Sequence, residues 1–248
     1  MYLFQKFNLK IMIQHWVHSK RFKEGLILGL FTFISIGLFI FRYYYTGSIV
    51  FGFLLWNLFL AFIPWALTSA TLMIPKIRNV NGVVVALLVL WLLFFPNAPY
   101  ILTDLFHLKN QTNMPIWYDL VLILSFAWTG LLYGMFSLWD LEYLVRGKIS
   151  KLFSAIISTG LLFLCSFGIY LGRYLRWNSW DLWSQPGALM NDIIDRFLNP
   201  LDHPRTWGMT LVLGVFLNIV YWTFKYLREE RYDHLPKVPV ANFDRLRD

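Results

Sequence analysis

The residues best suited to acid–base or binding chemistry lie together, directly after a hydrophobic run. Asn97, Tyr100, Asp104 and His107 are spaced three, four and three positions apart. On an α-helix this spacing places all four side chains on one face. A carboxylate and an imidazole in such apolar surroundings need partners or water, because burying either group alone is costly. The pattern therefore predicts a polar site.

Two prolines in the same stretch leave a second interpretation open. Pro96 and Pro99 interrupt the preceding helix and begin a new turn, for which Asn97 is a candidate N-cap. In the functional interpretation, Asp104 and His107 are the candidate catalytic residues, an anion beside a base. In the structural interpretation, the polar side chains only satisfy backbone groups that the prolines leave unpaired.

A second polar group follows the fifth hydrophobic block. Arg173 and Arg176 form a fork suited to a carboxylate or phosphate, and the Trp rings nearby can stack on a ring or sugar. The alternative is a pair of snorkelling arginines beside an interfacial tryptophan belt. The simplest arrangement pairs Asp104 with one of the arginines, so we predict a single site. The candidate ligand-binding residues are Asn97, Tyr100, Asp119, Arg173, Arg176, Trp177, Asn178, Trp180 and Asp181.

Metal binding is a weaker alternative for the same residues. Asp104 and His107 are the candidate ligands, and Asp181, Asp202 and His203 are candidate additions from the outer face. No pair has a recognised ligand spacing, so we predict neither a metal nor a cofactor. The chain also lacks a P-loop, a glycine-rich dinucleotide motif and the signatures of intramembrane proteases. These motifs name neither a substrate nor a reaction.

The elements that must position these residues are membrane spans. Of the 248 residues, 58% are hydrophobic and only 15% are charged, against about 25% charged residues in a soluble domain. The hydrophobic residues fall into blocks near the length of a transmembrane helix, about 17 to 25 residues. We predict an all-α fold, a polytopic membrane helix bundle with six transmembrane helices and an extracytoplasmic loop helix over 187–199. The six blocks are 25–41, 49–72, 80–95, 120–138, 152–171 and 207–224.

Charged segments flank this six-span membrane domain, which we place at 25–225. Residues 1–24 are basic with interleaved apolar residues, which predicts an amphipathic segment on the membrane surface. Residues 226–248 are charged and contain two prolines, which predicts a cytoplasmic tail. The single cysteine, Cys165, lies within the fifth block and excludes an intrachain disulfide.

The distribution of basic residues predicts the orientation. The N-terminal segment, the 73–79 and 139–151 loops and the C-terminal tail hold 16 of the 22 Lys and Arg residues, and the other loops hold 6. The positive-inside rule therefore places both termini in the cytoplasm and both polar segments on the outer face. The net charge of +8 lies in short segments between spans. It favours contact with anionic lipid headgroups over nucleic-acid binding.

Two segments of the chain resemble a known family. Residues 95–105 read Phe-Pro-Asn-Ala-Pro-Tyr-Ile-Leu-Thr-Asp-Leu, and residues 173–181 read Arg-Tyr-Leu-Arg-Trp-Asn-Ser-Trp-Asp. Both resemble the signature segments of the bacterial multi-pass membrane proteins catalogued as domain of unknown function 1361. The resemblance covers roughly residues 50 to 225. It implies a multi-pass protein of the bacterial inner membrane, and it transfers no catalytic residue because the family has no assigned activity.

These observations leave three functions open. The first is a polar outer-face site that binds or acts on an anionic lipid or a lipid-linked envelope precursor, with the arginines holding the anion. The second is a structural or accessory subunit that packs against a membrane-protein partner. The third is a small transporter, which is disfavoured because the spans carry few ionisable residues.

Overall fold

The computed structural model describes residues 20–74, 81–108, 113–145 and 149–233 and is all-α there, as expected. The predicted 1–24 segment lies largely outside the described residues, and residues 20–24 begin the first helix. Residues 226–233 extend the last helix, and 234–248 are not described. The helices are α2 (Lys20–Thr46), α3 (Phe53–Met73), α5 (Asn81–Phe94), α6 (Asn97–Tyr100), η1 (Ile101–His107), α7 (Ile116–Val145), α8 (Lys151–Tyr174), α9 (Asp181–Ser184), α10 (Pro186–Leu198) and α11 (Pro204–Asp233).

Six helical stretches are long and apolar enough to cross a membrane, which confirms the predicted fold class. The third is composite: α5, α6 and η1 together make one apolar stretch, Gly82–His107. The first is longer than predicted, because α2 continues to Thr46 and so carries Arg42 inside a helix instead of in a loop. The predicted outer loop helix is α10.

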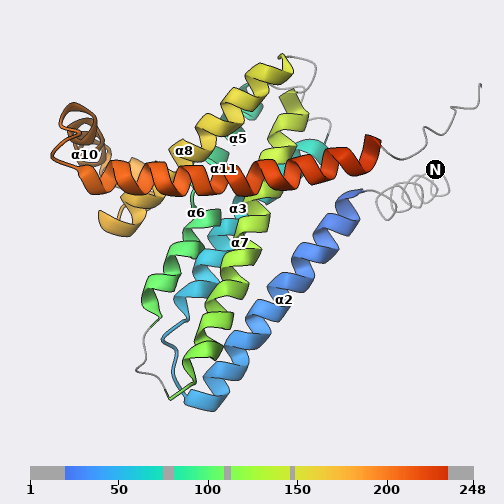
Figure 1. Cartoon of the computed structure of the whole chain (residues 1–248), viewed down its shortest axis with the longest axis vertical. Helices are drawn as coiled ribbons and strands as arrows, with labels where there is room; N and C mark the ends of the chain where they lie inside the picture. Colours follow the sequence, from blue (N-terminus) through green and yellow to red (C-terminus); the bar gives the residue numbers. More distant parts are fainter. Residues whose placement is uncertain (1–19, 75–80, 109–112, 146–148, 234–248) are drawn as a thin grey trace, which may run out of the picture.

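The central element of the bundle is α7. Of its most apolar window 61% is buried, against at most 39% in any other span. Helices α2, α3, α6 and η1 pack on it, whereas α8 packs mainly against α11. Figure 1 shows α11 crossing the other long helices obliquely, with the start of α2 and the end of α11 on the same side of the molecule.

Two ion pairs hold α2 against α7, one near each end. Arg21 pairs with Asp140, and Arg42 pairs with Asp119 at 2.7 Å. The partners are 21 positions apart on both helices, which is about 32 Å of helix at 1.5 Å per residue. The hydrocarbon core of a bilayer is about 30 Å thick. The charges of α2 and α7 therefore bracket a length of apolar helix that matches a membrane.

Glycines on α7 and α8 let the short helix α6 pack closely against both helices. A Cβ atom at Gly130 of α7 would lie 2.6 Å from the Ala98 carbonyl oxygen, and one at Gly168 of α8 would lie 2.9 Å from Pro96. Gly134 and Gly172, four positions further along each helix, make similar contacts with α6. Small residues at this spacing let membrane helices approach closely. This close packing brings α6 and η1 against the C-terminal end of α8.

Candidate functional site

The candidate site lies where η1 meets the ends of α3 and α8. The Asp104 carboxylate on η1 is only 1% exposed and forms an ion pair with the guanidinium of Arg173 on α8. Its other oxygen accepts a hydrogen bond from Nδ2 of Asn57 on α3, at 2.8 Å. A buried charge is stable only when paired and hydrogen-bonded, and both conditions are met here. The expected pairing of the two polar segments is therefore present.

Three residues of one face support the Arg173 guanidinium. Its Nε donates to Thr103 Oγ1 at 2.9 Å, and its charged centre lies 4.5 Å from the Tyr100 ring and 5.8 Å from the Phe106 ring. A 3₁₀-helix has three residues per turn, so positions three apart are stacked one above another. Within the described chain, Nη1 of this side chain makes no hydrogen bond.

His107 lies on the other side of the same carboxylate. Its Nδ1 is 3.3 Å from the backbone oxygen of Asp104 and 3.9 Å from Oδ1, and its side chain is 47% exposed. The ring also lies 5.0 Å from that of Phe53. With a proton on Nδ1, His107 donates to the Asp104 backbone and keeps Nε2 as an acceptor. The arrangement can therefore offer both a fixed cation and an accessible imidazole.

Asn97, Tyr100, Asp104 and His107 do not lie on one α-helical face, as the sequence had predicted. The polar stretch is one α-turn followed by a 3₁₀-helix, so Asp104 and His107 share a side while Tyr100 lies on the neighbouring side. Asn97 is not the N-cap, because Pro96 holds that position. The Asn97 side chain instead donates to the Phe94 carbonyl at 3.0 Å and to Ser179 Oγ at 3.1 Å.

The second segment touches the first at two places. Ser179 donates to the Leu93 carbonyl at 3.0 Å beside its contact with Asn97, and Arg173 makes the other connection. Trp177 points elsewhere, since its Nε1 donates to Asp192 on α10 at 2.8 Å. Asn178 and Asp181 bond to each other across a turn, and Trp180 is exposed.

Two charged residues that were predicted to join the cluster, Asp119 and Arg176, also lie outside it. Asp119 was expected beside Asp104, but it forms a two-pronged pair with Arg42, and both side chains are 1% exposed. The reason is the extension of α2, which brings Arg42 to the start of α7. Arg176 follows the end of α8 with φ 63, so it leaves the helical path and is exposed.

Two carboxylates outside the spans are held by hydrogen bonds. A backbone hydrogen bond from Asn178, together with the side chains of Ser184 and Asn178, lowers the pKa of Asp181. Hydrogen bonds from Asn199 and His203 lower the pKa of Asp195 on α10. Hydrogen bonding favours the ionised form of both groups, and both complete local turns between α8 and α11. Asp181 therefore belongs to a turn and not to the Asp104 cluster.

Sequence reasoning missed three residues that complete the site. Asn57, Thr103 and Ser179 are not among the predicted site residues. Thr103 lies one position before Asp104 within the same motif, so the motif itself was the available signal. The Gly-x-x-x-Gly spacings of α7 and α8 were a second signal, because they mark close contact. Nothing local in the sequence pointed from Asn57 to Asp104.

The comparisons place the chain in a family. The family model described as "Protein of unknown function (DUF1361)" matches residues 56–220, which include both polar segments. The chain belongs to this family. No curated protein and no solved structure matches.

Proposed function

We propose that this member of the DUF1361 family binds an anionic lipid headgroup, or the phosphate of a lipid-linked envelope precursor, at the Asp104–Arg173 cluster. The same proposal places the protein in a bacterial inner membrane with both termini in the cytoplasm and the cluster at the outer leaflet. The Lys and Arg distribution supports that orientation.

The proposal rests on the positions of Arg173 and His107 beside Asp104. Arg173 and His107 flank the same oxygen of Asp104, and each keeps a nitrogen that has no partner within the described chain. The Arg173 guanidinium is a donor that suits phosphate oxygens, and the His107 imidazole is a second donor when both of its nitrogens carry a proton. Asp104 neutralises part of the charge and, with Tyr100, fixes the guanidinium in place. The expected ligand therefore meets a positioned edge of Arg173 and not a mobile side chain.

Titration with phosphatidylglycerol tests the proposal. We would purify the full chain in mild detergent and count bound lipids by native mass spectrometry, with uncharged diacylglycerol as the comparison lipid. Removing one charge-assisted hydrogen bond costs about 1.5 to 3 kcal/mol, so Arg173→Gln and His107→Gln should each weaken binding about tenfold or more. The half-exposed His107 tolerates substitution, so this variant keeps the test valid even where Arg173→Gln fails to fold.

Arg205→Gln is the matched control, because it removes one exposed outer arginine that contacts Tyr174 and not Asp104. Binding should be unchanged in this variant. An equal loss in all three variants would show general charge attraction, and no loss in the first two would show that the cluster is purely structural. Either outcome overturns the proposal.

A further inference from the structure

Helix α10 has three sides with different surroundings. One side contacts the protein: Arg196 is buried, its Nη1 bonds to the Asp192 backbone oxygen at 2.7 Å, and its own carbonyl accepts from Trp207 of α11 at 3.2 Å. The exposed remainder divides into two flanks. Asn191 and the partly exposed Asp195 lie on a polar flank together with the small Ala188, whereas the other flank is apolar.

The apolar flank is a continuous exposed stripe. Its members recur at helical spacing and continue past the end of α10. Leu198 is 73% exposed and Leu201 is 92% exposed. Only the inner edge of the stripe is partly covered, where Phe197 meets the rings of Phe167 and Trp207. We call Met190, Ile194, Phe197, Leu198 and Leu201 the α10 stripe.

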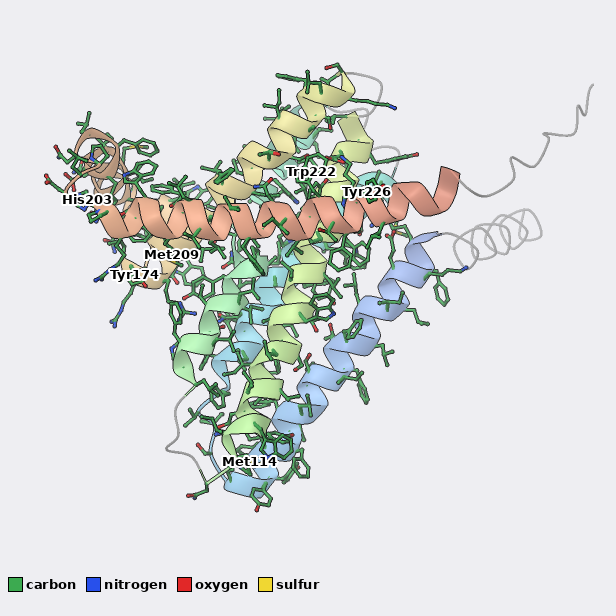
Figure 2. The ribbon with its side chains drawn as sticks, viewed as in Figure 1. Met114, Tyr174, His203, Met209, Trp222 and Tyr226 are labelled. Carbon is green, nitrogen blue, oxygen red and sulfur yellow. The ribbon has the colours of Figure 1, made fainter. Side chains whose placement is uncertain are left out.

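The position of α10 in the chain identifies what can cover this stripe. α10 joins the end of α8 to the start of α11, and both of these helices are candidate membrane spans. Figure 2 shows Tyr174, near the end of α8, and His203, just before α11, at one end of α11, far from Trp222 and Tyr226. A helix that links two span ends at the same membrane face lies at the boundary between lipid and water.

We propose that the α10 stripe inserts into the outer leaflet of the membrane, at the boundary of headgroups and acyl chains. Interfacial helices divide their exposed surface between an apolar and a polar face in this way. The candidate span α11 also carries exposed apolar side chains, among them Leu211 and Val212. The exposed cation Arg176 lies at the end of α8, one of the two span ends that α10 connects, where lipid phosphates lie.

This inference does not depend on the proposed ligand of Asp104 and Arg173. It concerns a separate surface that anchors the 172–206 segment. Hydrogen bonds from Trp177 to Asp192 and between Asp195 and His203 hold the helix in one orientation. The fixed orientation is what gives the stripe a defined depth in the leaflet.

Collision measurements on nitroxide labels test the insertion. The full chain with Cys165→Ala would carry Ile194→Cys or Leu198→Cys, with Ala188→Cys on the polar flank as the control, in nanodiscs of phosphatidylcholine and phosphatidylglycerol. Oxygen concentrates in lipid and a polar nickel complex in water. Labels at 194 and 198 should collide at least several-fold more with oxygen than with nickel, and the label at 188 should show the reverse.

Two results would overturn the proposal. Nickel accessibility at 194 and 198 equal to that at 188 would place the stripe in water. Protection of 194 and 198 from both reagents would mean that protein covers the stripe, either a second copy of the chain or another membrane protein. The labelled positions are exposed, so the fold is expected to tolerate each substitution.

Discussion

Arg173 shows how several weak supports combine on one side chain. Its guanidinium meets a carboxylate, a hydroxyl and two aromatic rings, all from residues 100–106. The fork geometry of arginine makes these contacts simultaneously, which the point charge of a lysine cannot do. The residue therefore joins α8 to η1 and holds its guanidinium in one position.

The buried pair of Arg42 and Asp119 supports a prediction about single and double changes. Arg42→Met alone should destabilise the protein by about 3 to 5 kcal/mol, because it leaves Asp119 without its charged partner. The double variant Arg42→Met, Asp119→Leu should recover most of this loss, since apolar replacement of a whole buried pair is often neutral. Chemical unfolding in detergent measures both.

A double variant as unstable as the single one would contradict this reading of the pair. It would mean that the remaining contacts of Arg42, with the Ser48 carbonyl at 3.4 Å and the Phe51 ring at 4.5 Å, matter more than the charge pairing.

At the residue scale the sequence predicted that Asp104 pairs with Arg173 or Arg176, but it misplaced Asp119 and counted Arg176 in the same site. The partner of Asp119 depends on where α2 ends. The sequence analysis ended this helix a few residues too early and so placed Arg42 in a loop. The position of Arg176 depends on its own positive φ angle. Non-glycine residues rarely adopt such an angle, and sequence patterns do not indicate it. The sequence could predict that the buried charges pair, because an unpaired buried charge is costly. Which charge pairs with which depends on how the helices are aligned in three dimensions.

At the scale of elements, the 3₁₀ geometry of η1 decides which side chains meet. An α-helix would have aligned Tyr100 with Asp104, whereas here Tyr100, the last residue of α6, and Thr103 and Phe106 of η1 all contact one guanidinium. The prolines around α6 predicted a break in the helix but not the type of turn that follows. The glycines of α7 and α8 then fix how closely α6 approaches.

Gly130→Ala tests this close approach. The new Cβ would lie 2.6 Å from the Ala98 carbonyl oxygen, and that backbone atom cannot move without displacing α6. Overpacking of this kind costs about 1 to 3 kcal/mol, so the melting temperature in detergent should fall.

The control for this change is Gly160→Ala on α8, where the added Cβ would meet no atom within 4 Å apart from the adjoining backbone of its own helix. That variant should be neutral or slightly more stable, because alanine favours helix over glycine. Equal melting temperatures for the two variants would argue against a tight α6–α7 contact.

The hydrogen bonds of Asp195 predict a pH effect on the end of α10. Hydrogen bonds lower its pKa, and the bond from Asn199 has a larger effect than the bond from His203. The carboxylate therefore contributes stability above the ordinary aspartate pKa of about 3.9, and this contribution is lost as pH falls through the lowered value. Hydrogen exchange at the C-terminal end of α10, corrected for intrinsic rates, should show lost protection on going from pH 5 to pH 3.

Asp195→Asn provides the comparison for that experiment. The variant should have weaker protection already at pH 5 and little further change down to pH 3. A wild-type helix end whose protection does not respond to pH would show that Asn199 and His203 hold it without the charge.

At the scale of the whole molecule, α7 organises the bundle through charges at both ends. Asp119 and Asp140 bind α2, and Glu142 binds Lys225 of α11 at 2.8 Å. The six spans were predictable because hydrophobic blocks of membrane length are a strong local signal. The central position of α7 and the oblique crossing of α11 could not be predicted, because both depend on packing between segments that are distant in the sequence (Figure 1).

Thiol labelling in intact cells tests the orientation. In a Cys165→Ala background, Asp202→Cys should react with an impermeant reagent from outside, and Lys151→Cys should react only after the membrane is opened. Both side chains are exposed, so access depends on the compartment. Labelling of Lys151→Cys alone from outside would reverse the orientation and place the Asp104 cluster in the cytoplasm.

The central claim is that residues 96–108 and 172–181 form one cluster through Asp104 and Arg173. A double-mutant cycle of Asp104→Asn and Arg173→Gln, measured as unfolding free energy in detergent, tests it most directly. Each single change should destabilise the protein by about 3 kcal/mol, and the double variant should lose much less than the sum. Strictly additive effects, with each single change below about 0.5 kcal/mol, would contradict the claim and make the two segments independent surface features.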